Sequence, residues 1–349
     1  MTLTVIRAPA GWLGPGRLVE DVSVSMESGR IGFAGTWTEW TSDSASARSD
    51  IEEIYVDGFL MPGVVDRHVH IGLSDPVSIV TAGVTAVRDL AWPPEVIFRL
   101  VEASESPAFN GPLVRAAGAM ITAVGGYPTR AEWAPMGTGV EVRGAEDAAA
   151  TARKLLDQGA VVLKVALNSE AGPTLSDEEL VAACDVAHEA ETIVTAHVQG
   201  SGQAARALGA GVDEFAHCPW SERLADDLIH AVAKRMRIVS TLDIHSYGLD
   251  TPELRTATDN LARFLAAGGK VAYGTDLGNG PIPAGIHAAE AWHLLGAGLT
   301  HERILEAMTF RPLATDEPAD LVALGGNPLE GLNALSDVRL VMHAGRRFR

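Results

Sequence analysis

Short apolar segments that read as β-strands alternate with helix-like segments through most of this chain, and this alternation limits the possible folds more than any other feature. The alternation begins near residue 60 and ends near residue 310. Eight strand-like segments occur in this region: Val64–His70, Val84–Leu90, Leu113–Ile121, Val161–Leu167, Ile193–Val198, Val212–His217, Ile238–Ile244 and Val271–Asp276. Strands that alternate with helices are typical of α/β proteins with a parallel sheet.

Helix start signals lie between several of these segments. Ser176 and Glu179 form a capping box before an apolar run, and Thr251 stands directly before Pro252. Eight strands separated by helices over roughly 250 residues predict a (β/α)8 barrel, the TIM barrel. A doubly wound sheet is the alternative. It would normally have a glycine-rich phosphate loop after its first strand, and this sequence has none there.

The two ends of the chain lack this alternation. Residues 1–58 contain only short strand-like stretches, and strand-like sequence returns after residue 318 at Ala319–Leu324 and Val338–His343. We therefore expect a barrel domain at residues 59–315. Residues 1–58 and 316–349 are expected to form one small β-sandwich-like domain beside the barrel.

Composition and charge exclude several classes of function. The 27 basic and 45 acidic side chains give a net charge of −18, which disfavours nucleic acid and anionic membranes as partners. No apolar stretch reaches the ~18 residues of a membrane-spanning helix, and the first residues do not resemble a secretory signal. With only two cysteines, Cys184 and Cys218, the expected compartment is the reducing cytoplasm. The expected partner is a small-molecule substrate, and a homo-oligomer is compatible with these features.

Metal-binding side chains stand where the predicted strands end. His68 and His70 close the first strand and, being two residues apart, point to the same face. The fifth, sixth and eighth strands end in His197, His217 and Asp276. In a barrel these strand ends meet at one mouth, where active sites lie. Imidazole and carboxylate groups bind zinc and related metals, and one catalytic zinc usually takes three protein ligands. The surplus of ligands therefore predicts two divalent metal ions, with zinc as the expected metal.

Lys164 lies within the apolar fourth strand, in a chain that has only four lysines. A charged amine at this place would repel metal cations. Burial lowers the pKa of a lysine and so supplies the neutral amine that reacts with CO2. The product is a carbamate, whose two oxygens can bridge two metal ions. We therefore expect CO2 to be present as a carbamate on Lys164.

Several motifs, taken together, resemble those of the amidohydrolase superfamily. They are Leu60-Met61-Pro62-Gly63-Val64-Val65-Asp66-Arg67-His68-Val69-His70, Gly83-Val84-Thr85-Ala86-Val87-Arg88-Asp89, Leu163-Lys164-Val165, Ala196-His197, Ala216-His217, Gly274-Thr275-Asp276, and Ala319-Asp320-Leu321-Val322 with Gly326-Asn327-Pro328-Leu329. The resemblance covers nearly the whole chain. Within the superfamily, the chain looks most like the prolidase-like and acyl-dipeptidase carboxypeptidases.

The resemblance implies a role for each ligand. It implies that His68, His70 and Asp276 bind a buried metal ion. It implies that His197 and His217 bind a more exposed metal ion. A hydroxide and the carbamylated lysine would then bridge the two ions.

Two residues in predicted loops are expected to contact the substrate. Tyr127 follows a pair of glycines, where relatives often have a histidine. His245 lies at the end of the seventh predicted strand, where some relatives have a tyrosine that polarises the scissile carbonyl. His245 is therefore also a candidate catalytic residue. Trp133 and Tyr247 lie in the same two loops, where they could line the pocket or simply pack.

The expected reaction is hydrolysis of an amide or related C–N bond in an N-acyl amino acid, a dipeptide or a cyclic amide. A metal-bridging hydroxide would attack, and Asp276 would take its proton and pass it to the leaving nitrogen. A mononuclear zinc deaminase is the first alternative, and it would not need Lys164. An ester, lactone or phosphotriester hydrolase would use the same centre. The non-enzymatic alternative is a barrel without metals that serves as an assembly protein.

Overall fold

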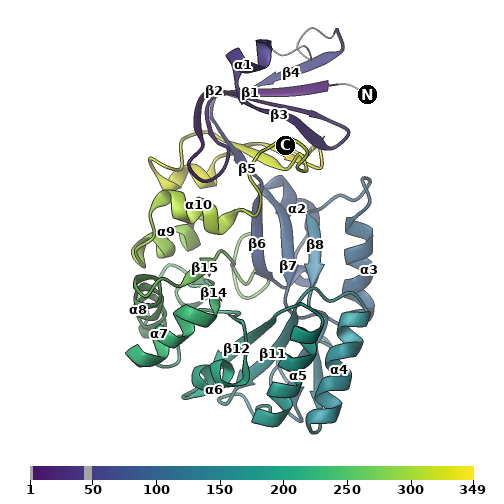
Figure 1. Cartoon of the computed structure of the whole chain (residues 1–349), viewed down its shortest axis with the longest axis vertical. Helices are drawn as coiled ribbons and strands as arrows, with labels where there is room; N and C mark the ends of the chain where they lie inside the picture. Colours follow the sequence, from purple (N-terminus) through teal and green to yellow (C-terminus); the bar gives the residue numbers. More distant parts are fainter. Residues whose placement is uncertain (1–2, 43–48) are drawn as a thin grey trace.

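All eight strand-like segments of the middle region contain β-strand, and they form a (β/α)8 barrel in the computed structural model, which describes residues 3–42 and 49–349 (Figure 1). The prediction of a TIM barrel is confirmed. One part of the barrel wall is a parallel sheet with the order β6 (Val64–Val69), β7 (Val84–Asp89) and β8 (Leu113–Ala116). The other part is a parallel sheet with the order β10 (Gly139–Val142), β9 (Met120–Ala123), β11 (Leu163–Asn168), β12 (Val194–Gln199), β13 (Glu214–Phe215), β14 (Arg237–Val239) and β15 (Lys270–Ala272).

The barrel closes where the first strand meets the segment after the last one. The His70 N–H donates a hydrogen bond to the Leu277 carbonyl (2.7 Å), and the Asp276 N–H donates one to the His68 carbonyl (2.8 Å). These bonds continue the sheet beyond the end of β15. They bring the end of β6 beside residue 276, although the two lie far apart in the sequence.

The third predicted strand is wrong in its extent. The sequence predicts one strand over Leu113–Ile121, but the structure has two strands, β8 and β9, that pair with different neighbours. Gly118 lies between them with a φ of +74°, in the left-handed region that interrupts a strand. The alternation of apolar residues continues through this break, so the sequence pattern alone does not reveal it.

Helices separate the strands and begin where the sequence predicts. In the capping box of α5, the Ser176 hydroxyl accepts a hydrogen bond from the Glu179 N–H, and the Glu179 carboxylate accepts one from the Ser176 N–H. The helices of the barrel are α2 (Pro76–Thr81), α3 (Pro94–Ser104), α4 (Ala145–Asp157), α5 (Asp177–Glu189), α6 (Gln203–Ala210), α7 (Asp226–Arg235), α8 (Pro252–Ala266), α9 (Ala288–Gly296) and α10 (His301–Met308). Short 3-10 turns add η2 (Ile71–Leu73), η3 (Asp243–His245) and η4 (Leu332–Ser336).

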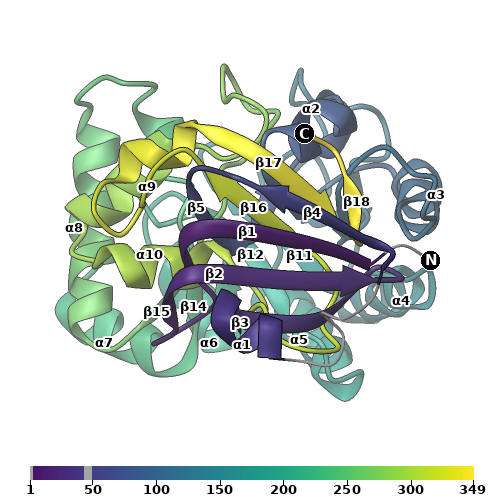
Figure 2. The same cartoon turned by 90° about the horizontal axis from the view of Figure 1, so that it is seen from above.

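The two ends of the chain form one β-sheet beside the barrel, as predicted (Figures 1 and 2). Its strand order is β18 (Arg346–Arg347), β17 (Val338–His343), β16 (Leu321–Leu324), β5 (Phe59–Pro62), β1 (Leu3–Trp12), β2 (Leu18–Glu27) and β3 (Arg30–Thr36), while β4 (Ile51–Tyr55) also pairs with β1. The short helix α1 (Trp37–Ser42) follows β3. Since β5 pairs with both β1 and β16, it joins the N-terminal strands to the C-terminal ones. The domain boundaries at residues 58 and 315 stay predictions.

The length of the helices also bears on the membrane prediction. Within residues 3–42 and 49–349, no helix has both the length and the apolar character that crossing a membrane requires.

Candidate metal centre and active site

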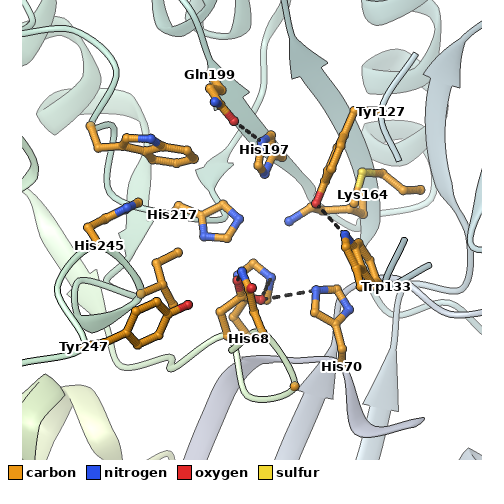
Figure 3. A pocket seen from close by; sticks show the side chains of 16 residues that line it. His68, His70, Tyr127, Trp133, Lys164, His197, Gln199, His217, His245 and Tyr247 are labelled. Carbon is orange, nitrogen blue, oxygen red and sulfur yellow. Dashed lines mark hydrogen bonds and ion pairs between the residues drawn. The ribbon is translucent and has the colours of Figure 1, made fainter. Parts of the chain in front are cut away.

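The six predicted metal ligands line one cavity and come from five segments of the barrel. Figure 3 labels five of the six residues, all except Asp276. The cavity has a volume of about 270 Å³. The six residues are His68 in β6, His70 just after β6, Lys164 in β11, His197 in β12, His217 after β13 and Asp276 after β15. All six side chains are buried, and Lys164 is fully inaccessible to solvent. The structure therefore brings together every ligand that the sequence predicts.

Three of these residues form a compact metal-binding group. The Asp276 Oδ1 atom lies 3.1 Å from His68 Nε2 and 3.2 Å from His70 Nε2. One ligand atom of each residue lies within 4.8 Å of the other two. The second ring nitrogen of each histidine faces a backbone carbonyl, with His68 Nδ1 2.7 Å from the Ala216 oxygen and His70 Nδ1 3.2 Å from the Ala91 oxygen. Such contacts place the proton on Nδ1, which leaves Nε2 free to bind a metal.

The other two histidines are held by neighbouring side chains. His217 Nδ1 lies 2.9 Å from the Thr241 hydroxyl, so Nε2 is the ring atom of His217 that is free to bind a metal. His197 Nε2 lies 3.3 Å from Asn168 Nδ2, so its Nδ1 is the atom left. The ring centroids of His197 and His217 are 4.9 Å apart, and those of His68 and His217 are 4.4 Å apart. The four imidazoles thus form one continuous cluster.

Unpaired polar atoms at this cavity fit a bound metal. Among the described residues, Lys164 Nζ is buried with no hydrogen-bond partner, while His68 Nε2 and Asp276 Oδ1 are buried and lie within ion-pair distance of each other without a well-directed hydrogen bond. Unpaired polar groups in a protein interior cost free energy and are rare. A divalent cation would satisfy the nitrogen and carboxylate atoms. The lysine amine would join them only in a form that can coordinate a metal.

Burial puts the ligands in the protonation states that metal binding requires. It lowers the pKa of His197 to about 3 and the pKa of His217 well below its usual value. It also lowers the pKa of Lys164 to about 7, so much of this lysine is a neutral amine near neutral pH. Burial alone would raise the pKa of Asp276, but the neighbouring His68 and His70 hold it well below the usual range. His68, His197 and His217 are thereby neutral and the Asp276 carboxylate is ionised. Burial alone would lower the pKa of His70, but its hydrogen bond to Asp276 raises it.

Asp276 has a strained backbone that other residues hold in place. Its φ is +58°, in the left-handed region that residues with a side chain rarely adopt. The buried carboxylate of Asp66 accepts hydrogen bonds from the Thr275 N–H (3.1 Å), the Thr275 hydroxyl (2.5 Å) and the His68 N–H (3.1 Å). Asp66 thus fixes the loop of Asp276 to the strand of His68. Asp66 belongs to the first quoted motif, but its sequence position alone predicts no ligand, catalytic or positioning role for it.

Both predicted substrate residues line the cavity. The Tyr127 ring stacks on His197 with centroids 4.8 Å apart, and its hydroxyl accepts a hydrogen bond from Trp133 Nε1 (3.1 Å). His245 lies in η3, and its Nε2 is buried without a hydrogen-bond partner among the described residues. Burial lowers the pKa of His245 to about 4, so the ring is neutral at neutral pH. Figure 3 shows Tyr127 and Trp133 on one side of the metal ligands, and His245 and Tyr247 on the other.

The seventh predicted strand is also shorter than expected. The sequence predicts a strand over Ile238–Ile244, but β14 ends at Val239 and the chain turns at Thr241, whose φ is +42°. The turn lets the Thr241 hydroxyl reach His217 and places His245 in η3 rather than at a strand end.

A buried polar network holds η3 against α9. The Asp243 carboxylate contacts His287 Nε2 (2.6 Å) and His293 Nε2 (3.0 Å), and it accepts a hydrogen bond from the Ser246 hydroxyl (2.6 Å). The carboxylate of Glu290 accepts hydrogen bonds from the N–H groups of Leu242 and Asp243. This network fixes the segment that carries His245. Sequence reasoning missed it, because its members are far apart in the chain and match no motif.

Other cavity residues were also missed. Trp220 lines the cavity, and its ring centroid lies 4.5 Å from that of His245. Gln199 and Asn279 line it as well, and the Asn279 amide donates a hydrogen bond to Asp276 Oδ2 (2.8 Å). Trp133 and Tyr247, for which the sequence left two roles open, both line the cavity. Gln199 lies two residues after a predicted ligand, and this spacing was the only available signal for it.

Comparison with solved structures shows the same fold over the whole chain. Ochratoxinase from A. niger has 20% sequence identity and a TM-score of 0.81, covering 100% of this chain and 96% of that one. A Xaa-Pro dipeptidase with bound methionine has 21% identity and a TM-score of 0.81, covering 99% of both chains. A prolidase complexed with N-methylphosphonate-L-proline has 22% identity and a TM-score of 0.78, again covering 99% of both chains.

Comparison of sequences assigns the family. No curated protein sequence matches the chain. The amidohydrolase family profile matches residues 59–346, a range that includes all six candidate ligands. The chain therefore belongs to the amidohydrolase family, as a metal-dependent hydrolase that acts on C–N bonds.

Proposed function

We propose that this chain is a binuclear hydrolase that cleaves an amide bond in a small molecule. One observation carries the proposal: six potential ligands converge on one buried cavity, and Lys164 Nζ among them has no hydrogen-bond partner among the described residues. A single metal ion would need only His68, His70 and Asp276. The remaining histidines and the lysine would then be free to hold a second ion, which supports a binuclear centre.

The residues that would hold each metal follow from their positions. His68, His70 and Asp276 would hold one ion, and His197 and His217 would hold the other. Lys164, as a carbamate, would supply oxygen ligands to help hold the metal ions. Zinc fits this set because it binds imidazole and carboxylate ligands.

Bound divalent metals would lower the pKa of a water molecule and polarise the substrate carbonyl. The protein itself would move the proton. Asp276 Oδ1 faces the cavity, while its Oδ2 is held by the Asn279 amide, so the carboxylate keeps one orientation. It would accept a proton from water and donate it to the leaving nitrogen.

The other residues of the cavity would bind and orient the substrate. His245 is neutral, and its Nε2 has no partner within the described chain, so this ring could donate a hydrogen bond to the substrate carbonyl oxygen. The Tyr127 hydroxyl could donate from the opposite side. Two of the three structures compared above are a dipeptidase and a prolidase, which supports an amide or peptide bond as the target.

Removing the lysine tests the proposal. We expect Lys164→Ala to lose metal and hydrolytic activity together, since the two ions lose the group between them. Acetate or propionate, added with zinc, should restore part of both by supplying a carboxylate. Metal content is measured by mass spectrometry, and activity by a screen of N-acyl amino acids, dipeptides, cyclic amides and esters.

Lys154→Ala is the matched control, because Lys154 is exposed on α4. It should keep the metal content and activity of the wild type. The binuclear proposal fails if Lys164→Ala retains two metal ions per chain. A wild-type protein with one ion per chain and deaminase activity would favour the mononuclear alternative.

A further inference from the structure

The walls of the cavity are aromatic or uncharged outside the metal centre. Among residues 3–42 and 49–349, no arginine lines the cavity, and Lys164 is the one lysine that does. The residues that face the remaining space include Tyr127, Trp133, Trp220, Tyr247, Gln199 and Asn279. We propose, on the basis of the function proposed above, that this site takes an uncharged amide with an aromatic group and rejects substrates with a free carboxylate.

Apart from Lys164, no lysine or arginine of the described chain lies on the cavity wall. A carboxylate that leaves water needs a paired charge or several hydrogen-bond donors, and arginine is the usual partner. Lys164, the one lysine among the described lining residues, is fully buried beside the candidate ligands, and the function proposed above would occupy it with the metal ions. A free carboxylate on the substrate would therefore find no cationic side chain on this wall to pair with.

Asn279 and Gln199, the amide side chains among the described lining residues, each use one N–H group within the protein. Asn279 Nδ2 donates to Asp276 Oδ2 (2.8 Å). Gln199 Nε2 donates to Glu170 Oε2 (2.7 Å), and Gln199 Oε1 accepts from Asn168 Nδ2 (2.8 Å). Glu170 thus places an exposed carboxylate directly behind Gln199. This negative charge would repel an anionic substrate, in a chain whose net charge is already −18.

Aromatic rings on both sides of the metal ligands carry the second part. On one side, Trp133 lies 4.4 Å from the His70 ring, between centroids. On the other side, Trp220 lies 5.5 Å from the His217 ring. Flat aromatic surfaces favour a planar aromatic group between them, with edge or stacked contacts. Trp133 and Trp220 are therefore the residues that set specificity in this inference.

Matched substrates that differ by one charge test the inference. We compare N-acetylphenylalanine amide with N-acetylphenylalanine on the metal-loaded full-length protein, and we measure acetate release. The carboxamide and the carboxylate have nearly the same size. We expect the neutral compound to have a kcat/KM at least about tenfold higher, which corresponds to ~1.4 kcal/mol. An equal or higher kcat/KM for the acid would overturn the inference.

Variants locate the selectivity in the residues named. Glu170→Gln should reduce the preference for the neutral compound about two- to threefold, and the control Glu178→Gln, at an exposed site on α5, should not. Trp220→Leu should remove most of the preference for N-acetylphenylalanine amide over N-acetylleucine amide. Trp292→Leu, a partly exposed tryptophan on α9, is its control and should leave that preference unchanged. If both tryptophan variants behave alike, Trp220 does not set specificity.

A binding measurement separates this inference from the proposed function. The methanesulfonyl analogues of the same pair replace the acetamide by a sulfonamide that resists hydrolysis. Calorimetry should show tighter binding of the neutral analogue, with both ligands recovered intact. If neither acetyl compound is hydrolysed but the neutral analogue still binds more tightly, the proposed function fails and this inference holds. If the carboxylate analogue binds as tightly, this inference fails whatever the turnover.

Discussion

Two groups of buried charged side chains lie in the same barrel, and they differ in how their polar atoms are paired. Both carboxylate oxygens of Glu214 are paired, one with Arg88 Nη2 and one with Arg237 Nε, each at 2.5 Å. At the cavity, Lys164 Nζ has no hydrogen-bond partner within the described residues, and Asp276 Oδ1 faces only the ring nitrogens of His68 and His70. A fully paired buried charge needs no further ligand, whereas unpaired buried atoms call for an explanation such as a missing ion. The comparison distinguishes a structural cluster from a functional one.

The pKa directions show the same contrast. Burial alone would raise the pKa of Glu214, but the positive charges of Arg88 and Arg237 outweigh it and lower this pKa. For Lys164, burial is the largest influence, and no pair reverses it. Glu214 is thus stabilised as an ion by its neighbours, while Lys164 is driven towards its neutral form.

The largest expected effect is a loss of turnover on substitution of Asp276 at the cavity. Asp276→Asn should lower kcat about 10²–10⁴-fold, because the asparagine oxygen can still coordinate a metal but cannot move a proton. At least one metal ion per chain should be retained, as measured by mass spectrometry on the purified variant. Asp185→Asn, at an exposed position on α5, is the control and should keep normal turnover. Near-normal kcat in Asp276→Asn would remove Asp276 from proton transfer.

Substitution of Glu214, whose charge is paired with Arg88 and Arg237, should instead change the free energy of unfolding. Glu214→Gln should lower the free energy of unfolding by about 3 kcal/mol, because it leaves Arg88 buried without a counter-charge. Lys164→Met, tested in the same metal-free state, should lose little or even gain, since it removes an unpaired buried amine. Urea denaturation of both variants measures the difference. Equal losses would mean that pairing does not distinguish the two clusters.

His245 tests whether an unpaired atom binds substrate or metal. His245→Ala should lower kcat/KM about 10²-fold, the effect of losing one donor to the substrate oxygen, and should leave metal content intact. His230→Ala, at an exposed site on α7, provides the comparison. A parallel fall in metal content would make His245 a ligand. If neither kcat/KM nor metal content changes, His245 contacts neither the substrate nor a metal ion.

The smallest expected effect is on the free energy of unfolding, through the pair of His293 and Asp243 that helps to hold η3. Burial alone would lower the pKa of His293, but its hydrogen bond to Asp243 raises it above 6.5. A raised pKa in the folded protein means that the pair stabilises the fold fully below pH 6.5, and that this stabilisation is lost as the pH rises through the raised pKa. His293→Gln should therefore cost about 1 kcal/mol at low pH and less at high pH.

Denaturation at several pH values measures this difference. His188→Gln is the control, because its pair with Asp213 is largely exposed and should contribute only a few tenths of a kcal/mol. A loss in His293→Gln that does not change with pH would exclude an ionic pair with Asp243.

The sequence predicts the barrel and the candidate ligands that meet at one cavity, because both depend on local patterns. Most of the candidate ligands stand at or near the C-terminal end of a strand, and in a barrel of parallel strands these ends meet at one mouth. The break at Gly118 and the turn at Thr241 are not visible in the pattern, because the apolar alternation continues through them. Trp220 and Asp243 were also missed. Their contacts come from distant segments, which a single sequence does not bring together.

The joining of the chain ends in one sheet has a consequence for the order of folding. β5 precedes the barrel, yet one of its edges pairs with β16, which follows the barrel. During synthesis this edge stays open until residues 321–324 have emerged, and an open strand edge is a site for aggregation. His68 and Asp276 meet only when the barrel closes, which also needs late residues. A nascent chain therefore carries an exposed edge and no complete metal centre until nearly all of it has been made.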